Sequence, residues 1–273
     1  MSLKTILVYL PRADDAPQTI AAAALLARRT GAHVIGLHVL EAIMVHMTTD
    51  IYLPGDVLTR FSTQQTEQAE KVESVFRETC RMEDFASEWR RVECQAAAAS
   101  DVAVQHARSA DLIILPQGPA DDTRFNAALI RESGRPCLVI PRDGTVEALG
   151  RNVLVGWSAT REAARAAHDA LPLLEEEAEV RVVKVGDTPS GEQEFASNDM
   201  AVMFDRHGAK TTVVNRAPGS DAIGDVLMRE AFESGADLIV TGAFGHSRAY
   251  DFVLGAVTSH LLEKAELPVL FSK

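Results

Sequence analysis

The sequence contains few cysteines, and their arrangement suits neither a disulfide framework nor a zinc site. Cys80, Cys94 and Cys137 are odd in number and far apart, and no C-x-x-C pair occurs in the 273 residues. Such a set is typical of reduced thiols in a cytoplasmic protein. We therefore expect the three cysteines to be small, buried, apolar side chains.

Long apolar runs are also missing. No stretch approaches the roughly 20 apolar residues that a membrane-spanning helix needs. The short apolar run Ile6–Leu10 is followed at once by Pro11 and Arg12, so it does not resemble the apolar part of a signal peptide. We expect a cytoplasmic protein without a membrane span.

Positive charge is scarce. The chain has 27 Lys and Arg against 39 Asp and Glu, a net charge of −12. Because an acidic chain repels phosphate backbones, a nucleic-acid partner is not expected. Walker A, H-E-x-x-H and G-x-S-x-G motifs are absent, and the eight histidines show no paired ligand spacing. The sequence therefore predicts no metal ligands and no catalytic residues.

What the chain does contain is a regular alternation. Apolar runs of strand length, such as Thr5–Leu10 and Asn152–Trp157, alternate with amphipathic stretches such as Ala16–Arg29 and Gln64–Arg81. Continuous Val, Ile and Leu runs are typical of strands that are buried on both faces of a parallel sheet. Strands and helices in alternation predict an α/β fold.

The order of these elements occurs twice. Ala110–Ile114 recurs as Ala236–Val240, and Pro136–Val139 recurs as Pro268–Phe271. Such self-similarity indicates an internal duplication. Polar residues and glycines interrupt the apolar pattern near Asp143–Gly150, so we expect two domains, residues 1–147 and 148–273.

Glycines follow the fourth predicted strand of the second half. Gly242, Gly245 and Gly255 form the pattern G-x2-G-x9-G, and a helix is predicted to begin near Gly255. Glycines let backbone N–H groups approach an anion closely, and a helix N-terminus adds unpaired N–H groups and a positive dipole end. The alternative is that these glycines only form turns and allow strand and helix to pack.

With this loop, the chain resembles the universal stress proteins in their tandem form, with two family domains in one polypeptide. The resemblance extends over Gly31–Val39, the Ala-Asp-Leu-Ile strand of each half and the last strand of each half. It implies that each domain is a five-stranded parallel sheet with helices on both faces, a Rossmann-like fold of the adenine nucleotide alpha hydrolase type. It also implies that the two domains pair through their last strands.

The resemblance further implies a nucleotide site in the second domain, degenerate in the first. The ligand would be ATP or another adenine nucleotide, with Mg²⁺, and its phosphates would contact the glycine loop. The implied site residues are Gly156, Trp157, Ser158, Val183, Val185, Gly242, Gly245, His246, Gly255, Ala256, Val257 and Thr258.

Three departures from the family pattern weaken this site. Ala256 stands where the family has Ser or Thr, and losing that hydroxyl donor to phosphate costs about 1–3 kcal/mol. Ser158 and Pro11 stand where the family usually has Asp at the end of the first strand. In the first half the corresponding loop, predicted over Gln117–Asp122, contains one glycine, a proline and two acids that would repel a triphosphate.

Three functions are compatible with these residues. The first is a stress-response binding or regulatory protein that binds ATP in its second domain and has no turnover of its own. The second is a nucleotide-independent interaction scaffold. Its surface for an unknown protein partner or an apolar ligand would be the methionine-rich segment Ala42–Pro54 of the first domain. The third is a slow ATP hydrolase, for which no general base is evident. A homodimer is compatible with each.

Overall fold

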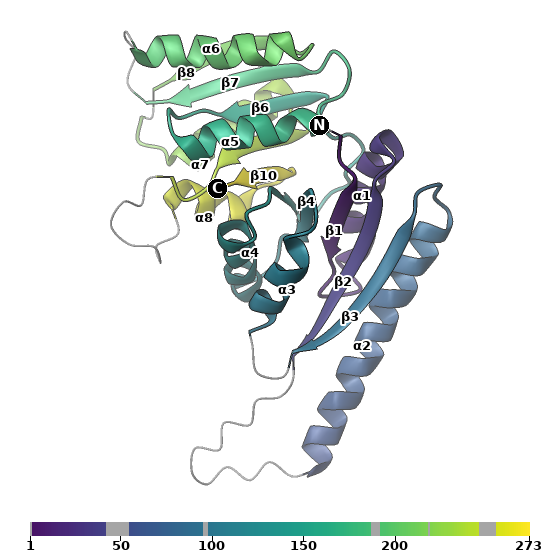
Figure 1. The fold of residues 1–273 in the computed structure, drawn as a ribbon. Coiled ribbons are helices and arrows are strands. Elements are labelled where there is room, and N and C mark those ends of the chain that lie inside the picture. Colours follow the sequence, from purple (N-terminus) through teal and green to yellow (C-terminus); the bar gives the residue numbers. More distant parts are fainter. Residues whose placement is uncertain (1, 42–54, 95–97, 187–191, 218, 246–254) are drawn as a thin grey trace.

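Ten strands form one sheet in the computed structural model, which describes all residues except 1, 42–54, 95–97, 187–191, 218 and 246–254. Their spatial order is β3-β2-β1-β4-β5-β10-β9-β6-β7-β8. Every neighbouring pair is parallel except β5 and β10, which run antiparallel. Each half therefore contributes a five-stranded parallel sheet, and the predicted α/β fold class is confirmed (Figure 1).

The N-terminal half consists of β1 to β5 and the helices between them. Its elements are β1 (Thr5–Tyr9), α1 (Ala16–Thr30), β2 (His33–Glu41), α2 (Gly55–Arg81), β3 (Ser87–Cys94), α3 (Ala99–Ala107), β4 (Leu112–Pro116), α4 (Ala120–Glu132) and β5 (Cys137–Ile140).

The C-terminal half repeats the same order. Its elements are β6 (Asn152–Gly156), α5 (Arg161–Ala170) with the 3₁₀ turn η1 (Leu171–Leu173), β7 (Glu179–Val185), α6 (Glu192–Arg206), β8 (Lys210–Arg216), α7 (Ile223–Ser234), β9 (Leu238–Gly242), α8 (Ala256–Lys264) and β10 (Val269–Ser272).

The two halves join through their last strands. Val139 of β5 pairs with Val269 of β10, and Cys137 pairs with Phe271. This is the pairing that the family resemblance implied. All four residues are buried, so the junction is part of the core and not a surface contact.

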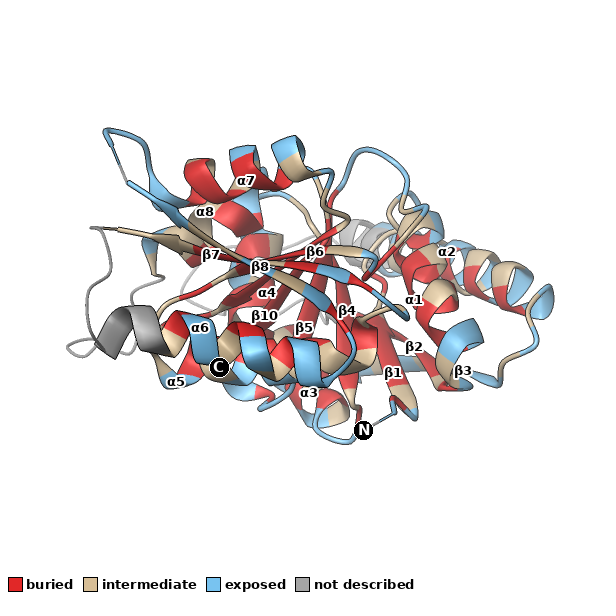
Figure 2. Ribbon diagram, turned by 90° about the horizontal axis from the view of Figure 1, so that it is seen from above, coloured by how far each residue is buried: buried red, intermediate tan, exposed pale blue. Residues whose placement is uncertain are grey.

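The core lies in two layers, one on each face of the sheet. Buried side chains of α1, α2, α5 and α6 share one apolar cluster, and those of α3, α4, α7 and α8 share the other. Figure 2 shows buried residues along the central strands and on the helix faces that are turned toward the sheet. The sheet lies between these layers, and folds of this type bind ligands at the carboxyl ends of the strands.

The repeated aspartate has a structural role in both halves. The Asp111 carboxylate accepts hydrogen bonds from the backbone N–H groups of Lys4 and Thr5. Asp237 accepts the equivalent bonds from Gly150, Arg151 and Asn152. Each aspartate thereby holds the beginning of the first strand of its half against the fourth strand.

Two sequence expectations about the N-terminal half were wrong in extent. α2 begins at Gly55, not at Gln64, and Figure 1 shows that it extends well past the sheet. Residues 120–122, expected in a loop, form the first turn of α4. Amphipathic patterning does not mark the beginning of α2, because that part of the helix lies beyond the sheet. It does not mark the first turn of α4 either, because acidic side chains there are favoured by the helix N-terminus. No helix in the described part of the chain is long and apolar enough to span a membrane.

Candidate functional site

A small pocket lies at the carboxyl ends of β6, β7 and β9, with a volume of about 130 Å³. β6 and β9 are the neighbours at which the strand order of the C-terminal half changes direction. Their chain connections leave toward opposite faces of the sheet, which opens a crevice between the strand ends. The pocket therefore lies where a doubly wound sheet usually holds its ligand.

Seven of the residues implied by the resemblance line this pocket: Gly156, Trp157, Ser158, Val183, Val185, Gly242 and Val257. Ile223, Leu227 and Thr241 complete the lining and were missed. Ile223 and Leu227 lie four residues apart on α7, so they share one helix face. That spacing was visible in the sequence, but only the packing of α7 against β6 shows which way the face points.

The strand ends keep the pocket open through glycine. A Cβ added at Gly156 would lie 3.1 Å from Cδ1 of Leu227, in space that now belongs to the pocket. Trp157, which is 8% exposed, is held in place because its backbone N–H donates to the Val183 carbonyl at 2.8 Å. Ser158 Oγ lies 3.3 Å from Oγ1 of Thr160, the residue that caps α5.

Gly242 is required by packing. A Cβ at this position would lie 2.5 Å from the backbone nitrogen of Ala163 and 2.6 Å from the carbonyl carbon of Glu162. Because both atoms belong to the backbone of α5, they cannot move aside without shifting the helix. The alternative interpretation of these glycines, that they allow strand and helix to pack, therefore accounts for Gly242 without any ligand.

Gly245 has a different neighbourhood. A Cβ there would lie 2.9 Å from Oε2 of Glu162 and 3.3 Å from Oγ1 of Thr160. These are side-chain ends, so the close approach is between the loop and a carboxylate. The glycine at this position brings the backbone next to a negative charge.

Four predicted residues, Gly255, Ala256, Val257 and Thr258, lie at the beginning of α8. Of these four, only Val257 lines the pocket. Gly255 is the N-cap residue of α8, and a Cβ there would meet nothing closer than 3.7 Å. Ala256 is exposed. Thr258, which is 3% exposed, points into the protein. His246 lies outside the described residues.

Phe244, within the glycine loop, adopts a left-handed backbone conformation with φ of 64°. A side chain in this region costs about 1–3 kcal/mol and requires support from its surroundings. The Phe244 ring is 8% exposed and lies under the Arg131 guanidinium at 4.8 Å and near Lys273 Nζ at 5.7 Å. Since Arg131 belongs to α4, this contact links the loop to the N-terminal half.

Among the described residues, the equivalent strand ends of the N-terminal half carry aromatic and charged side chains that contact one another. Tyr9, the last residue of β1 as Gly156 is of β6, stacks on Phe125 with ring centroids 4.2 Å apart. Nearby, Arg12 donates to Asp15 at 2.6 Å and also to Asp122 of α4. The hydrogen bond to Asp122 raises the pKa of Arg12, in spite of partial burial. Rings and an internal ion pair thus lie where the C-terminal half has its pocket.

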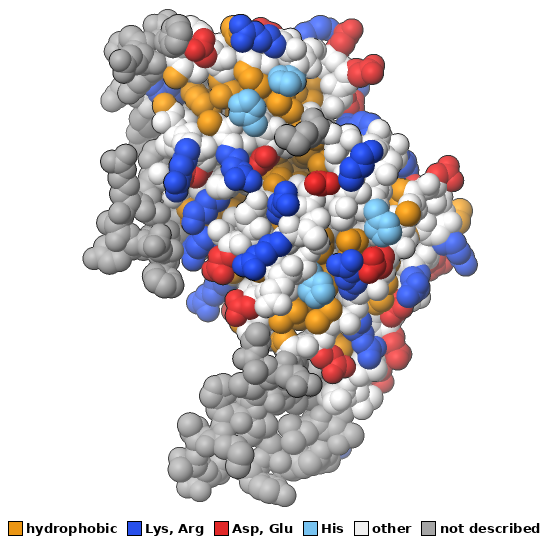
Figure 3. All heavy atoms as spheres, in the orientation of Figure 1, with side chains coloured by type: hydrophobic (Ala, Val, Ile, Leu, Met, Phe, Trp, Pro, Cys, Tyr) orange, Lys and Arg blue, Asp and Glu red, His pale blue; other side chains and the backbone are white. Residues whose placement is uncertain are grey.

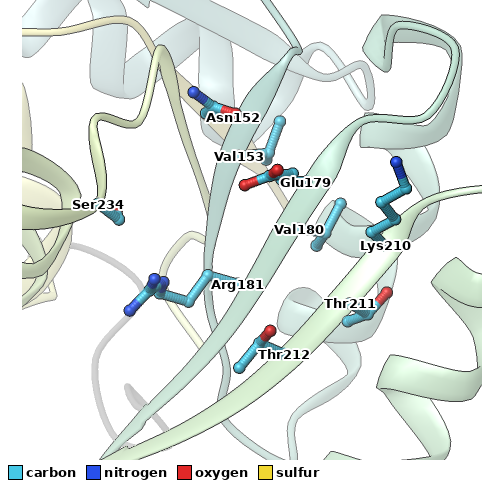
Figure 4. A pocket seen from close by; sticks show the side chains of 9 residues that line it. All are labelled: Asn152, Val153, Glu179, Val180, Arg181, Lys210, Thr211, Thr212 and Ser234. Atoms are coloured by element: carbon cyan, nitrogen blue, oxygen red, sulfur yellow. The ribbon is translucent and has the colours of Figure 1, made fainter.

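A larger hollow of about 300 Å³ lies at the opposite, amino ends of β6, β7 and β8. Figure 4 shows that its two cationic side chains, Arg181 and Lys210, point away from each other. Arg181 binds the buried Glu230 at 2.9 Å, and Lys210 binds Glu177 at 2.9 Å. Its cations are therefore already paired within the protein.

The net charge of −12 does not describe every surface. Figure 3 shows Lys and Arg side chains gathered across the middle of one face. The described residues contain no group of three or more His, Cys, Asp or Glu side chains that could hold a metal ion. Within that part of the chain, the pocket is lined by apolar side chains, glycines and the side chains of Ser158 and Thr241, and the Glu162 carboxylate lies beside Gly245.

Sheet order, duplicated halves and a pocket at the strand ends define a doubly wound α/β protein with two domains of one type. The C-terminal half of the chain, residues 150–273, matches the model of the universal stress protein family and belongs to it. No curated protein matches the sequence.

Two solved structures share the fold along the whole chain. A universal stress protein from Archaeoglobus fulgidus DSM 4304 aligns with 100% of this chain and 97% of its own, with 14% identity and a TM-score of 0.69. A protein of unknown function from Pseudomonas aeruginosa PAO1 aligns with 99% of this chain and 92% of its own, with 16% identity and a TM-score of 0.60. A universal stress protein in complex with cAMP covers 52% of this chain and 100% of its own, with 16% identity and a TM-score of 0.33.

Proposed function

We propose that the protein is a cytoplasmic stress-response regulator that binds an adenine nucleotide in its C-terminal half. The observation that carries the proposal is the pocket at the ends of β6 and β9, which gathers residues from five separate segments of the chain. It lies at the point where the strand order changes, the usual ligand position in this fold class. Occupancy of the pocket would bias an interaction with a partner.

The size of the pocket limits what enters it. A volume of about 130 Å³ is below the roughly 300–1,000 Å³ of pockets that enclose a whole drug-sized ligand. The apolar side chains of Val183, Val185 and Leu227 suit a flat ring such as a purine. The ribose and any phosphates would lie outside, over Gly242 and Gly245, and Mg²⁺ would accompany the phosphates.

A second function is favoured by a separate observation. The N-terminal half has filled its strand ends with the stack of Tyr9 on Phe125 and with the ion pair of Arg12 and Asp122. A domain that keeps the fold but places rings and an ion pair at these strand ends is suited to act as an interaction scaffold. The methionine-rich segment proposed for such a surface, 42–54, lies outside the described residues.

Filling the pocket tests the first function. We expect calorimetric titration of the native protein with adenosine and with ATP to show binding, and Gly156→Val to weaken both by at least tenfold. The added side chain would occupy the space beside Leu227. Phe232→Ala is the control, because Phe232 lies on α7 but is 85% exposed and should leave binding unchanged.

The opposite outcomes are equally clear. If neither adenosine nor ATP gives heat at millimolar concentration, nucleotide binding is contradicted and the interaction scaffold remains as the proposed function. Binding that Gly156→Val does not weaken would place the ligand elsewhere. Folding of the variant is checked by urea denaturation, since the Leu227 side chain can move by the few tenths of an ångström needed.

A further inference from the structure

Glu162 places a carboxylate beside the glycine loop. Its side chain is 7% exposed, and Oε2 lies 2.9 Å from the position that a Cβ would take at Gly245. Glu162 is the second residue of α5, the helix whose backbone adjoins Gly242. A negative charge therefore already stands where the glycine loop would receive phosphates.

This carboxylate is ionised at neutral pH. Burial raises the pKa of Glu162, but hydrogen bonds from Arg161, from its own backbone N–H and from Thr160 outweigh burial, so the pKa lies below its ordinary value. The first turn of a helix also favours a negative charge. The carboxylate thus accepts from its own N–H group in the first turn of α5, and the Ala163 N–H group donates to Thr160 Oγ1, so an incoming phosphate would compete with groups of the protein itself.

The partner of this charge lies at the surface. Arg161 Nε donates to Glu162 Oε1, and the Arg161 side chain is 88% exposed. Solvent screens an exposed guanidinium, so it compensates a buried carboxylate only in part. Within the described residues, the cations next to the Phe244 ring are Arg131 of α4 and Lys273, which follows β10.

We infer that Glu162 determines the ligand preference of the site, which accepts an uncharged adenine nucleoside in preference to a triphosphate. The inference rests on the proposed function, because it concerns the same pocket. The base would enter the apolar pocket with either ligand. A triphosphate would in addition bring several negative charges toward a buried carboxylate, and like charges at short range in a partly desolvated site repel strongly.

Removing the charge of Glu162 without changing the shape of the side chain tests this directly. Adenosine and ATP are titrated calorimetrically into the native protein, Glu162→Gln and Glu179→Gln, in magnesium-free buffer. We expect the native protein to bind adenosine at least tenfold more tightly than ATP. Glu162→Gln should improve ATP binding by about tenfold and leave adenosine binding unchanged. Glu179→Gln changes the net charge equally, but it lies at the amino end of β7 and should alter neither.

A second variant shifts the preference in the opposite direction and is expected to fold, because the side chain concerned is exposed. Arg161→Gln removes the partner of the carboxylate, so ATP binding should weaken several-fold while adenosine binding stays the same. Opposite effects of the two variants on ATP, with a constant affinity for adenosine, are the expected result and could not arise from general destabilisation.

The outcomes separate this inference from the proposed function. If adenosine and ATP bind but their ratio is the same in all variants, the role of Glu162 is wrong and nucleotide binding stands. If ATP binds the native protein more tightly than adenosine, the preference is also wrong. If neither ligand binds the native protein or Glu162→Gln, the proposed function fails and this inference fails with it.

Discussion

The two halves share one fold but treat the same strand ends in opposite ways. In the N-terminal half, the stack of Tyr9 on Phe125 and the ion pairs of Arg12 fill the space where β1 and β4 end. In the C-terminal half, Gly156 and Gly242 end β6 and β9, and a pocket of about 130 Å³ lies between them. The space between the strand ends therefore depends on a few residues at those ends and not on the fold.

The connection after the first strand of each half explains part of the difference. Residues 10–15 join β1 to α1, whereas only residues 157–160 join β6 to α5. The shorter connection brings the first turn of α5 onto β9, which is why Gly242 cannot carry a side chain. Pro116, the last residue of β4, occupies the corresponding position in the N-terminal half, where the longer connection leaves room for a ring.

The largest expected effect follows from this contact. Gly242→Ala should lower the free energy of unfolding by about 3 kcal/mol, because the new Cβ would meet the backbone of Ala163 at 2.5 Å. Gly156→Ala is the matched control. Its Cβ would meet only the Leu227 side chain at 3.1 Å, so it should cost less than about 1 kcal/mol. Urea denaturation measures both.

If Gly242→Ala and Gly156→Ala lowered the free energy of unfolding equally, α5 would be able to move away from β9. The proposed difference between the two halves would then be wrong. The comparison would also fail if Gly242→Ala were harmless and Gly156→Ala were costly. In either case, the shorter connection would not be what requires the glycine at the end of β9.

Most of the fold could be predicted from local sequence, and most of the site could not. Apolar runs and their repetition marked the strands, and Gly31 ended α1 as expected, with φ of 67°. The role of Glu162 has no local signal, because it depends on a loop about 80 residues further along the chain. The pairing of Asp122 with Arg12 likewise joins residues 110 positions apart, so two acids expected in a loop proved to be ion-pair partners at the beginning of α4.

A smaller effect is expected at that ion pair. Arg12→Gln should lower the free energy of unfolding by about 1 kcal/mol, because the Arg12 side chain is only 33% exposed and has two carboxylate partners. Arg124→Gln is the control, since Arg124 is 83% exposed and lies 3.9 Å from Asp121. Urea denaturation of both variants at low and high salt tests this. A cost for Arg12→Gln no larger than that of the control would show that the ion pair does not hold the N-terminal strand ends together.

The smallest expected effect is a pH dependence that belongs to the N-terminal half. His38, 4% exposed, contacts the Leu10 carbonyl through Nδ1 at 2.6 Å, directly after β1. Burial lowers its pKa, although the Leu10 carbonyl opposes this. In the unfolded chain His38 binds a proton near pH 6.5. Below that pH the unfolded state therefore binds more protons than the folded state, and the free energy of unfolding falls as the pH is lowered.

His38→Gln should reduce this slope, which urea denaturation between pH 5 and 7.5 measures. His106, whose pKa burial also lowers, is present in both proteins, so the difference between their slopes isolates His38. A slope that survives in His38→Gln would assign the pH dependence to other groups and remove His38 from the residues that hold the filled strand ends in place.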